Sequence, residues 1–304
     1  GVPTGEGFKY SLKVEADSVV TPSGGENGGI GTKFEGQDIE HFAYGSSSAK
    51  SVTLSFWVRS NKTGVYCCQL QVNQYGGSNQ YGQVKEYTIS AANTWEKKTL
   101  TFSGLTAQAV ETVTGDGLRV LWWLACGSSD HVAADTWIQS ASYAATSNQV
   151  NFMDSASNEW YLTGCQLEVG DTATDFEHRT FADEFQKCER YFQRIVKHGD
   201  GSGGSNTILG GSAVMYSSSY LSVVVTYRTT MRSPPTLVSA NSVGCFKLYR
   251  NNSNDVFDDF TQAGARSPYA IEMYNTSDVS GTAGHGGFIE TVNSNAEVHL
   301  DAEL

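Results

Sequence analysis

Three predicted strands, residues 51–60, 65–72 and 118–126, carry aromatic, amide and guanidinium side chains on the face opposite their apolar residues. The six side chains that leave the predicted core are Trp57, Arg59, Gln69, Gln71, Arg119 and Trp123. Aromatic rings cover the apolar faces of sugar rings, and amide and guanidinium groups hydrogen-bond to hydroxyl groups. With all three strands in one sheet, the pattern predicts a glycan-binding face. The alternative is a face that packs against a neighbouring subunit.

Other aromatic residues divide into loop and core positions. Tyr75, Tyr81 and Trp137 adjoin polar loops and are further candidates for ligand contact. Trp95 and Trp160 are assigned to the core, because a single large apolar side chain is more often buried than bound to a ligand.

Two carboxylate pairs raise the question of glycan cleavage. Glycoside hydrolysis needs two carboxyl groups about 5–10 Å apart on either side of the scissile bond. The sequence offers Asp258 with Asp259 and Asp154 with Glu159, and nothing in either spacing requires convergence. The sequence also lacks a nucleophile elbow, an H-E-x-x-H zinc motif and a P-loop. We therefore predict a protein without enzymatic activity, with a glycan depolymerase as an alternative.

Calcium is the only metal ion for which the sequence offers candidate ligands. Jelly-roll sugar binders often hold a structural calcium ion with carboxylate and carbonyl oxygens. Glu15, Asp17 and Glu168 are the candidate ligands here, although no stretch has EF-hand spacing. No cysteine and histidine spacing matches a zinc site, and no other cofactor is predicted.

The charge balance restricts the partners. The 304 residues include 20 Lys and Arg against 32 Asp and Glu, a formal net charge of −12. This argues against nucleic-acid binding, because phosphate neutralisation requires clustered Lys and Arg. No apolar run has the roughly 18–20 residues that a membrane-spanning helix needs. The chain begins with Gly1 rather than Met, which indicates a processed product or a fragment of a longer protein.

The composition favours short strands and turns over helices. Glycine accounts for 32 residues and aromatic residues for 12%, with only 5 prolines. The predicted fold class is mainly β, and the predicted segments follow in chain order. They are a jelly-roll-like β-sandwich over 1–178, a connecting α-helix over 179–197, a Gly/Ser-rich loop over 198–206 and a small C-terminal β-sandwich over 207–304.

The connecting helix is predicted from apolar residues at helical spacing, with Thr180 as the N-cap and Asp183 at the third helical position. It presents more apolar surface than one small sheet needs to cover. The residues predicted to form an oligomer interface are Phe181, Phe185, Tyr191, Phe192 and Ile195. Burying each large side chain contributes roughly 1.5–3 kcal/mol, and a closed ring of identical subunits provides such burial. The alternative is a helix that packs across its own domain's sheet.

Two segments resemble a known family. The run QLEVG (166–170), ATDFEHR (173–179) and CERYF (188–192), followed by MRSPPT (231–236) and the terminal DAEL (301–304), is similar to the C-terminal half of bacteriophage tail fibres and related virion structural proteins. Phe192 departs from the family, which often has a second Tyr there. Residues 1–160 resemble, loosely, the jelly-roll carbohydrate-binding modules of such proteins.

The resemblance implies a virion component, usually a homotrimer, that takes part in adsorption to the host. The implied partners are further copies of the chain, other virion proteins and a host cell-surface glycan. A tail fibre or receptor-binding protein is the first hypothesis. The alternative is a capsid decoration or head-fibre protein with a structural role.

Six cysteines complete the set of reactive side chains. Most of them lie in apolar runs, where a free cysteine behaves as a small hydrophobic residue. Cys67 and Cys68 are adjacent on a predicted strand, so they point to opposite faces and are poor partners for each other. We predict reduced core thiols, as in proteins assembled in a reducing compartment.

Overall fold

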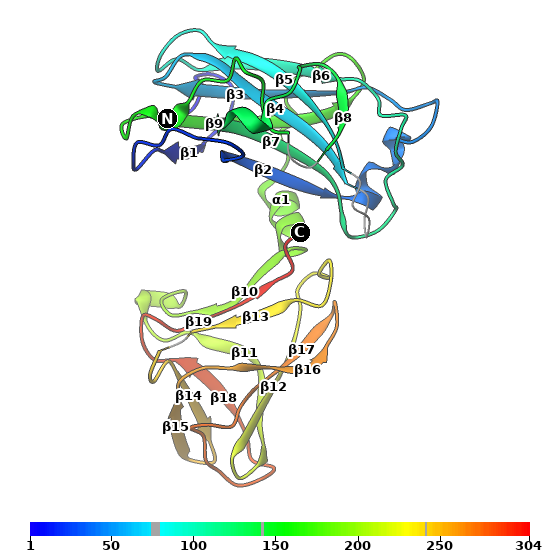
Figure 1. Ribbon diagram of the computed structural model, residues 1–304. Coiled ribbons are helices and arrows are strands. Elements are labelled where there is room, and N and C mark those ends of the chain that lie inside the picture. The colour runs from blue at the N-terminus through cyan, green and yellow to red at the C-terminus, as the bar shows by residue number, and fades with distance from the viewer. Residues whose placement is uncertain (74–79, 141–142, 241) are drawn as a thin grey trace. The chain divides into compact units, whose positions relative to one another are not determined.

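The computed structural model describes residues 1–304 except 74–79, 141–142 and 241, and it separates into two compact units. The first unit comprises residues 1–178 together with Leu304, and the second comprises residues 179–303. Both units are built from antiparallel sheets (Figure 1), which confirms the predicted mainly β, sandwich-type fold. Among the helices in the described ranges, none is long and apolar enough to cross a membrane.

The first unit is a sandwich of a four-stranded and a five-stranded sheet. The four-stranded sheet runs in the order β1 (Leu12–Glu15), β9 (Glu159–Val169), β3 (Val52–Ser60) and β6 (Glu96–Phe102). The five-stranded sheet runs in the order β2 (Asn27–Glu35), β7 (Asp116–Cys126), β4 (Gly64–Asn73), β5 (Gln80–Ile89) and β8 (Trp137–Gln139). The short 3-10 helices of this unit are η1 (Gly36–Phe42), η2 (Ser128–Asp130) and η3 (Phe152–Asp154).

Phe56 of β3 lies in the core between these two sheets. Its ring meets Trp122 of β7 and Tyr87 of β5 edge to face, with centroid distances of 5.7 and 5.2 Å. Such aromatic pairs contribute about 0.5–1.5 kcal/mol beyond the area that they bury. Trp160 is fully buried in the same core, as predicted.

The chain crosses from one sheet to the other between β3 and β4. The two strands follow each other closely in sequence but do not pair. β3 pairs with β6 and β9, whereas β4 pairs with β5 and β7. The outward face of β3 therefore belongs to the opposite side of the sandwich from the outward face of β4.

The second unit packs a three-stranded sheet against a seven-stranded sheet around a common core. The three-stranded sheet runs in the order β10 (Phe192–Lys197), β19 (Glu297–Asp301) and β13 (Thr236–Ser239). The seven-stranded sheet runs in the order β15 (Ser253–Phe257), β14 (Phe246–Arg250), β18 (Gly286–Thr291), β11 (Ile208–Ser217), β12 (Tyr220–Thr226), β17 (Ala270–Asn275) and β16 (Thr261–Arg266). A 3-10 turn, η4 (Ser202–Gly204), lies in the Gly/Ser-rich loop.

The predicted connecting helix over 179–197 is shorter than expected. α1 spans Phe181–Glu189 and begins with the predicted cap, in which the Thr180 hydroxyl accepts a hydrogen bond from the Asp183 amide at 3.2 Å. Residues 192–197 instead form β10, which pairs antiparallel with β19. Aromatic and β-branched residues suit a strand as well as a helix, and the ladder to β19 decides between them. By its contacts the helix belongs to the second unit.

The cysteines are free thiols with mixed exposure. Cys68 lies in the main core of the first unit and Cys67 in a small cluster on the other side of the sheet. Burial raises the pKa of both thiols. Cys165 and Cys188 are exposed, so the assignment of most cysteines to the core does not extend to these two.

Candidate functional site

Four of the six predicted glycan-binding residues meet on one surface, the outer face of the five-stranded sheet. Gln69 and Gln71 lie on β4, and Arg119 and Trp123 lie on the neighbouring strand β7 (Figure 1). Gln71 is the direct cross-strand partner of Arg119. We call this surface the Arg119–Trp123 face.

Hydrogen bonds join these four side chains in two pairs. The Trp123 indole N–H donates to Oε1 of Gln69 at 3.2 Å, and the Gln69 amide donates to the Tyr143 carbonyl at 2.9 Å. Nη1 of Arg119 donates to Oε1 of Gln71 at 3.3 Å. Nε of Arg119 donates to the Asp116 carboxylate at 2.6 Å. The indole and the guanidinium are therefore held in fixed orientations before any ligand arrives.

The two glutamines lie beneath the surface and hold the indole and the guanidinium from below. Gln69 is 1% exposed and Gln71 is 5% exposed, so neither offers much area to a ligand. Arg119 and Trp123 are only half-buried and are the groups that a ligand would meet. Asn73, at the end of β4, is buried with both amide atoms lacking a hydrogen-bond partner in the described ranges. The prediction thus placed the glutamines on the correct face but did not foresee their burial.

Two glycines on the edge strand β2 make room for the β7 side chains of the Arg119–Trp123 face. Gly29 pairs with Trp123 and Gly31 with Leu121. A Cβ at Gly29 would lie 3.0 Å from Cε3 of Trp123, and one at Gly31 would lie 2.5 Å from Cδ2 of Leu121. The absence of side chains at these positions leaves room for the Trp123 indole, which also packs against the small cluster of Cys67, Val84 and Ala145.

Trp57 and Arg59 lie elsewhere, on the outer face of the four-stranded sheet, so the prediction of a single six-residue face was wrong. Alternation along β3 assigned their direction correctly but not their sheet. The Arg59 guanidinium lies 5.2 Å from the ring centroid of Tyr161, and Trp95 meets Tyr161 edge to face at 6.2 Å. Trp95 is half-buried on this face rather than in the core.

Two of the further aromatic candidates, Tyr81 and Trp137, make hydrogen bonds within the protein. The Tyr81 hydroxyl donates to Gln139 at 3.2 Å, and the Trp137 indole N–H donates to the Ser103 carbonyl at 2.9 Å. Both rings pack against the core of the first unit. Tyr75 lies outside the described residues.

The candidate calcium ligands do not come together. Glu15 is paired with Glu159 at one end of β9, whereas Glu168 lies opposite Thr53 nine residues along the same strand. Lys13 forms an ion pair with Glu15, and the Glu168 carboxylate accepts hydrogen bonds from Thr174. Asp17 lies just beyond β1. In the part of the chain that the structure describes, no cluster of three or more acidic, histidine or cysteine side chains could hold a metal ion.

The carboxylate pairs differ in their surroundings. Lys62 binds Asp154, and Lys13 binds Glu159 at 2.8 Å; these contacts lower the pKa of both carboxyl groups. A general acid needs the opposite shift. Burial, together with Asp278 and Asp258, raises the pKa of Asp259.

The predicted interface residues separate into exposed and packed positions. Phe181 and Phe185 stack on each other at 5.8 Å on α1, with Phe181 83% exposed. Phe192 is also exposed, but it lies on β10 rather than on the helix. Ile195 packs against the core of the second unit, and Tyr191 is half-buried.

Comparison with known proteins finds no matching family model and no matching curated protein. Among solved structures, the chain is distantly similar to a family 16 carbohydrate-binding module, with 14% identity, 48% of this chain and 72% of that chain covered, and a TM-score of 0.23. It is also similar to the tandem CBM22 domains of Paenibacillus barcinonensis Xyn10C, with 10% identity, 96% and 94% coverage and a TM-score of 0.22. The binding domain of botulinum neurotoxin DC in complex with SialylT matches at 10% identity, 97% and 94% coverage and a TM-score of 0.20. At such TM-scores the similarities do not bear on the ligand of this chain.

Proposed function

We propose that this protein binds a host cell-surface glycan as a non-enzymatic component of a phage virion, a tail fibre or receptor-binding protein. The observation that carries glycan binding is the Arg119–Trp123 face, where a half-exposed indole and guanidinium are held by buried glutamines. The virion assignment is supported by the resemblance of residues 160–304 to tail-fibre proteins.

The geometry of the face suits a sugar. Trp123 offers an apolar surface for the C–H face of a pyranose, and Arg119 offers N–H donors to hydroxyl groups. Both side chains are already ordered by Gln69 and Gln71, so binding loses less side-chain entropy than it would at a mobile surface. Asp116 contacts Nε and Nη2 of Arg119, each at 2.6 Å, and Gln71 accepts a hydrogen bond from Nη1. The remaining N–H groups of Nη1 and Nη2 are left for the ligand.

Binding of the labelled full chain to a printed array of oligosaccharides tests the proposal. We expect Arg119→Ala and Trp123→Ala each to weaken binding about tenfold or more, equivalent to about 1.4 kcal/mol. Trp57→Ala is the matched control, because it removes a half-buried tryptophan from the other sheet. Equal binding by Trp123→Ala and the unmodified chain would overturn the proposal, as would the absence of binding to any glycan.

The depolymerase alternative has one supporting observation, the raised pKa of Asp259 beside Asp258 and Asp278. Release of reducing sugars from host polysaccharide, abolished by Asp259→Asn, would favour it over simple binding. The capsid decoration or head-fibre alternative gives the protein a structural role on the head, and labelling the protein on intact virions distinguishes head from tail.

A further inference from the structure

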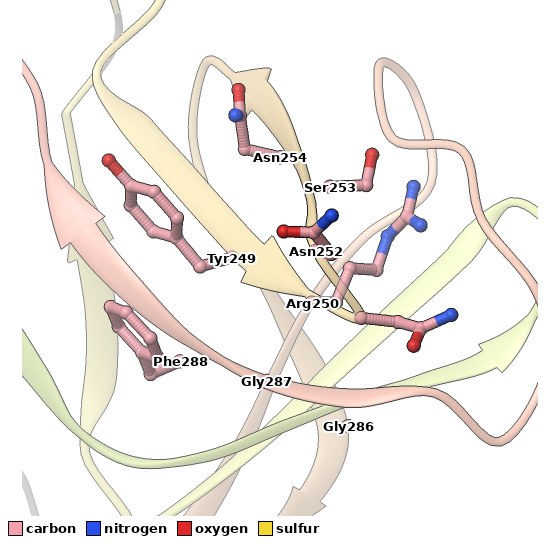
Figure 2. Close-up of a pocket in the computed structure, with 9 residues that line it drawn as sticks. Tyr249, Arg250, Asn252, Ser253, Asn254, Gly286, Gly287 and Phe288 are labelled. Atoms are coloured by element: carbon pink, nitrogen blue, oxygen red, sulfur yellow. The ribbon is translucent and has the colours of Figure 1, made fainter.

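An open cavity of about 500 Å³ lies at the end of the β14–β15 hairpin in the second unit (Figure 2). Residues 249–254 and 286–288 line it. None of these residues belongs to the Arg119–Trp123 face or to any site expected from the sequence.

The apolar wall of the cavity is a pair of stacked rings. Tyr249 on β14 and Phe288 on β18 are direct cross-strand partners. Their ring centroids are 5.0 Å apart with an interplanar angle of 11°, and Figure 2 shows the two rings side by side. Their neighbours Leu248 and Ile289 are buried in the core, so both rings stand on the outer face of the sheet, and Phe288 is 43% exposed. The wall is therefore rigid and accessible.

The polar rim of the cavity is the hairpin turn. Asn251 and Asn252 form a two-residue turn with φ values of 39° and 60°, a left-handed conformation that asparagine tolerates better than most residues. Asn254 follows on β15, opposite Tyr249. These three amide side chains are exposed, and none has a hydrogen-bond partner in the described ranges. They are free to bond a ligand.

Arg250 anchors this turn and does not offer its charge to the cavity. Its Nη2 lies 2.6 Å from the Asp255 carboxylate and also donates to the Ser280 carbonyl. Its side chain extends away from the two rings (Figure 2). The described lining is consequently aromatic and amide, apart from the paired Arg250. Lys247, two residues before Tyr249 on the same face of β14, adjoins this lining, with its Nζ 5.6 Å from the Tyr249 ring centroid.

A missing side chain creates the hollow. Gly286 lies two residues before Phe288 on the same face of β18, and a Cβ there would have no neighbour closer than the Ala213 carbonyl oxygen at 3.7 Å. At Gly287 a Cβ would instead collide with the Tyr249 carbonyl oxygen, so this glycine permits the close approach of β18 to β14. A larger residue at 286 would fill the cavity without displacing the backbone.

We infer that this cavity is a second saccharide site, which takes a neutral pyranose ring. The C–H face of the sugar lies against the exposed surface of the Tyr249–Phe288 stack, which is chiefly that of Phe288, and its hydroxyl groups bond to the amides of the turn. An acidic sugar is disfavoured by the net charge of −12 and by the pairing of Arg250, the cation of the lining, while the nearby Lys247 ammonium lies over the Tyr249 ring. The ligand class rests on the proposed function, but the residues are independent of the Arg119–Trp123 face.

Saturation-transfer NMR with methyl glucoside, methyl galactoside and methyl mannoside, each mixed with the full chain, tests the inference. We expect transfer to at least one of these neutral glycosides, weakened about tenfold by Gly286→Leu and by Phe288→Ala. Gly264→Leu is the matched control, since a Cβ at this β16 glycine meets nothing within 4 Å and one at Gly286 meets only the Ala213 carbonyl oxygen at 3.7 Å. Methyl glucuronide is the charged counterpart and should show no transfer that depends on residue 286.

Tryptophan fluorescence separates the two sites, because all six tryptophans lie in the first unit. If Trp123→Ala abolishes saturation transfer to the glycosides and Gly286→Leu leaves it unchanged, the second site is overturned and the proposed function stays intact. Loss in Gly286→Leu, with an unchanged fluorescence response to an array-identified glycan, would support the second site independently. No transfer to any neutral glycoside would also overturn the inference.

Discussion

The two candidate sites occupy the same place in their respective units, the outer face of the larger sheet, yet they achieve rigidity differently. On the Arg119–Trp123 face, buried glutamines hold the indole and guanidinium through hydrogen bonds across two strands. In the β14–β15 cavity, two rings stack on each other and a left-handed turn sets the amides. The first arrangement depends on buried polar groups, which are costly when a partner is lost. The second depends on exposed groups and backbone conformation, so its side chains can change with little effect on folding.

The largest predicted effect concerns avidity, which would act on both sites together. If Phe185 forms part of a trimer interface, Phe185→Asp places a charge on the exposed stack with Phe181 and dissociates the assembly. Apparent affinity for a glycan-coated surface should then fall by about a hundredfold, because linked sites gain effective concentration. Affinity for a monovalent glycoside should stay constant. Sedimentation of the unmodified chain as a stable monomer would contradict this prediction.

Gly287→Ala should damage the second site through the backbone. Its Cβ would collide with the Tyr249 carbonyl oxygen and push β18 away from β14, at a cost of about 3 kcal/mol in the free energy of unfolding of the second unit. Hydrogen exchange of the β14 and β18 amides, together with calorimetry, measures this loss. Gly286→Ala, one residue away in open space, is the control and should unfold like the unmodified chain.

Gln69→Leu should destabilise the first unit. The Tyr143 carbonyl and the Trp123 indole N–H would each lose a partner, which lowers the free energy of unfolding by about 1–2 kcal/mol. Denaturant unfolding followed by tryptophan fluorescence reports this unit alone. Asn254→Ala, which removes an exposed amide from the other site, should change stability by less than about 0.5 kcal/mol. Equal losses of unfolding free energy in Gln69→Leu and Asn254→Ala would contradict the proposed difference in how the two sites are held.

The smallest effect is expected at Asp259. Burial and the nearby Asp278 and Asp258 raise the pKa of Asp259 in the folded state, so the folded protein binds more protons than the unfolded chain. The free energy of unfolding therefore falls as pH rises through the raised pKa. Asp259→Asn should stabilise the second unit at pH 7 by up to about 0.5 kcal/mol, a small gain because solvent screens the site. The gain should disappear in acid, where Asp259 is protonated; thermal unfolding at a series of pH values measures it.

The local features of this protein follow from short stretches of its sequence. Alternation along β4 and β7 identified which side chains leave the core, and it placed Gln69, Gln71, Arg119 and Trp123 on one sheet face, where hydrogen bonds join them in two pairs. The start of α1 was predictable because the Thr180 cap depends only on residues three apart. The mainly β fold followed from composition and period, both of which are properties of short segments.

Which segments meet depends instead on packing between distant parts of the chain. Long-range pairing decides whether β3 joins the sheet of β4. Because β3 pairs in the other sheet, Trp57 and Arg59 lie on the opposite side of the sandwich from the predicted face. Residues 192–197 form a strand because they pair with β19, about a hundred residues later in the chain. The hydrogen bonds of this pairing outweigh the helical spacing of the apolar residues. The cavity beside Tyr249 and Phe288 arises from a cross-strand pair and a nearby glycine, which alternation can place on a face but cannot bring together. Side-chain direction is set by each strand's own backbone, whereas sheet partners are chosen by packing between distant segments.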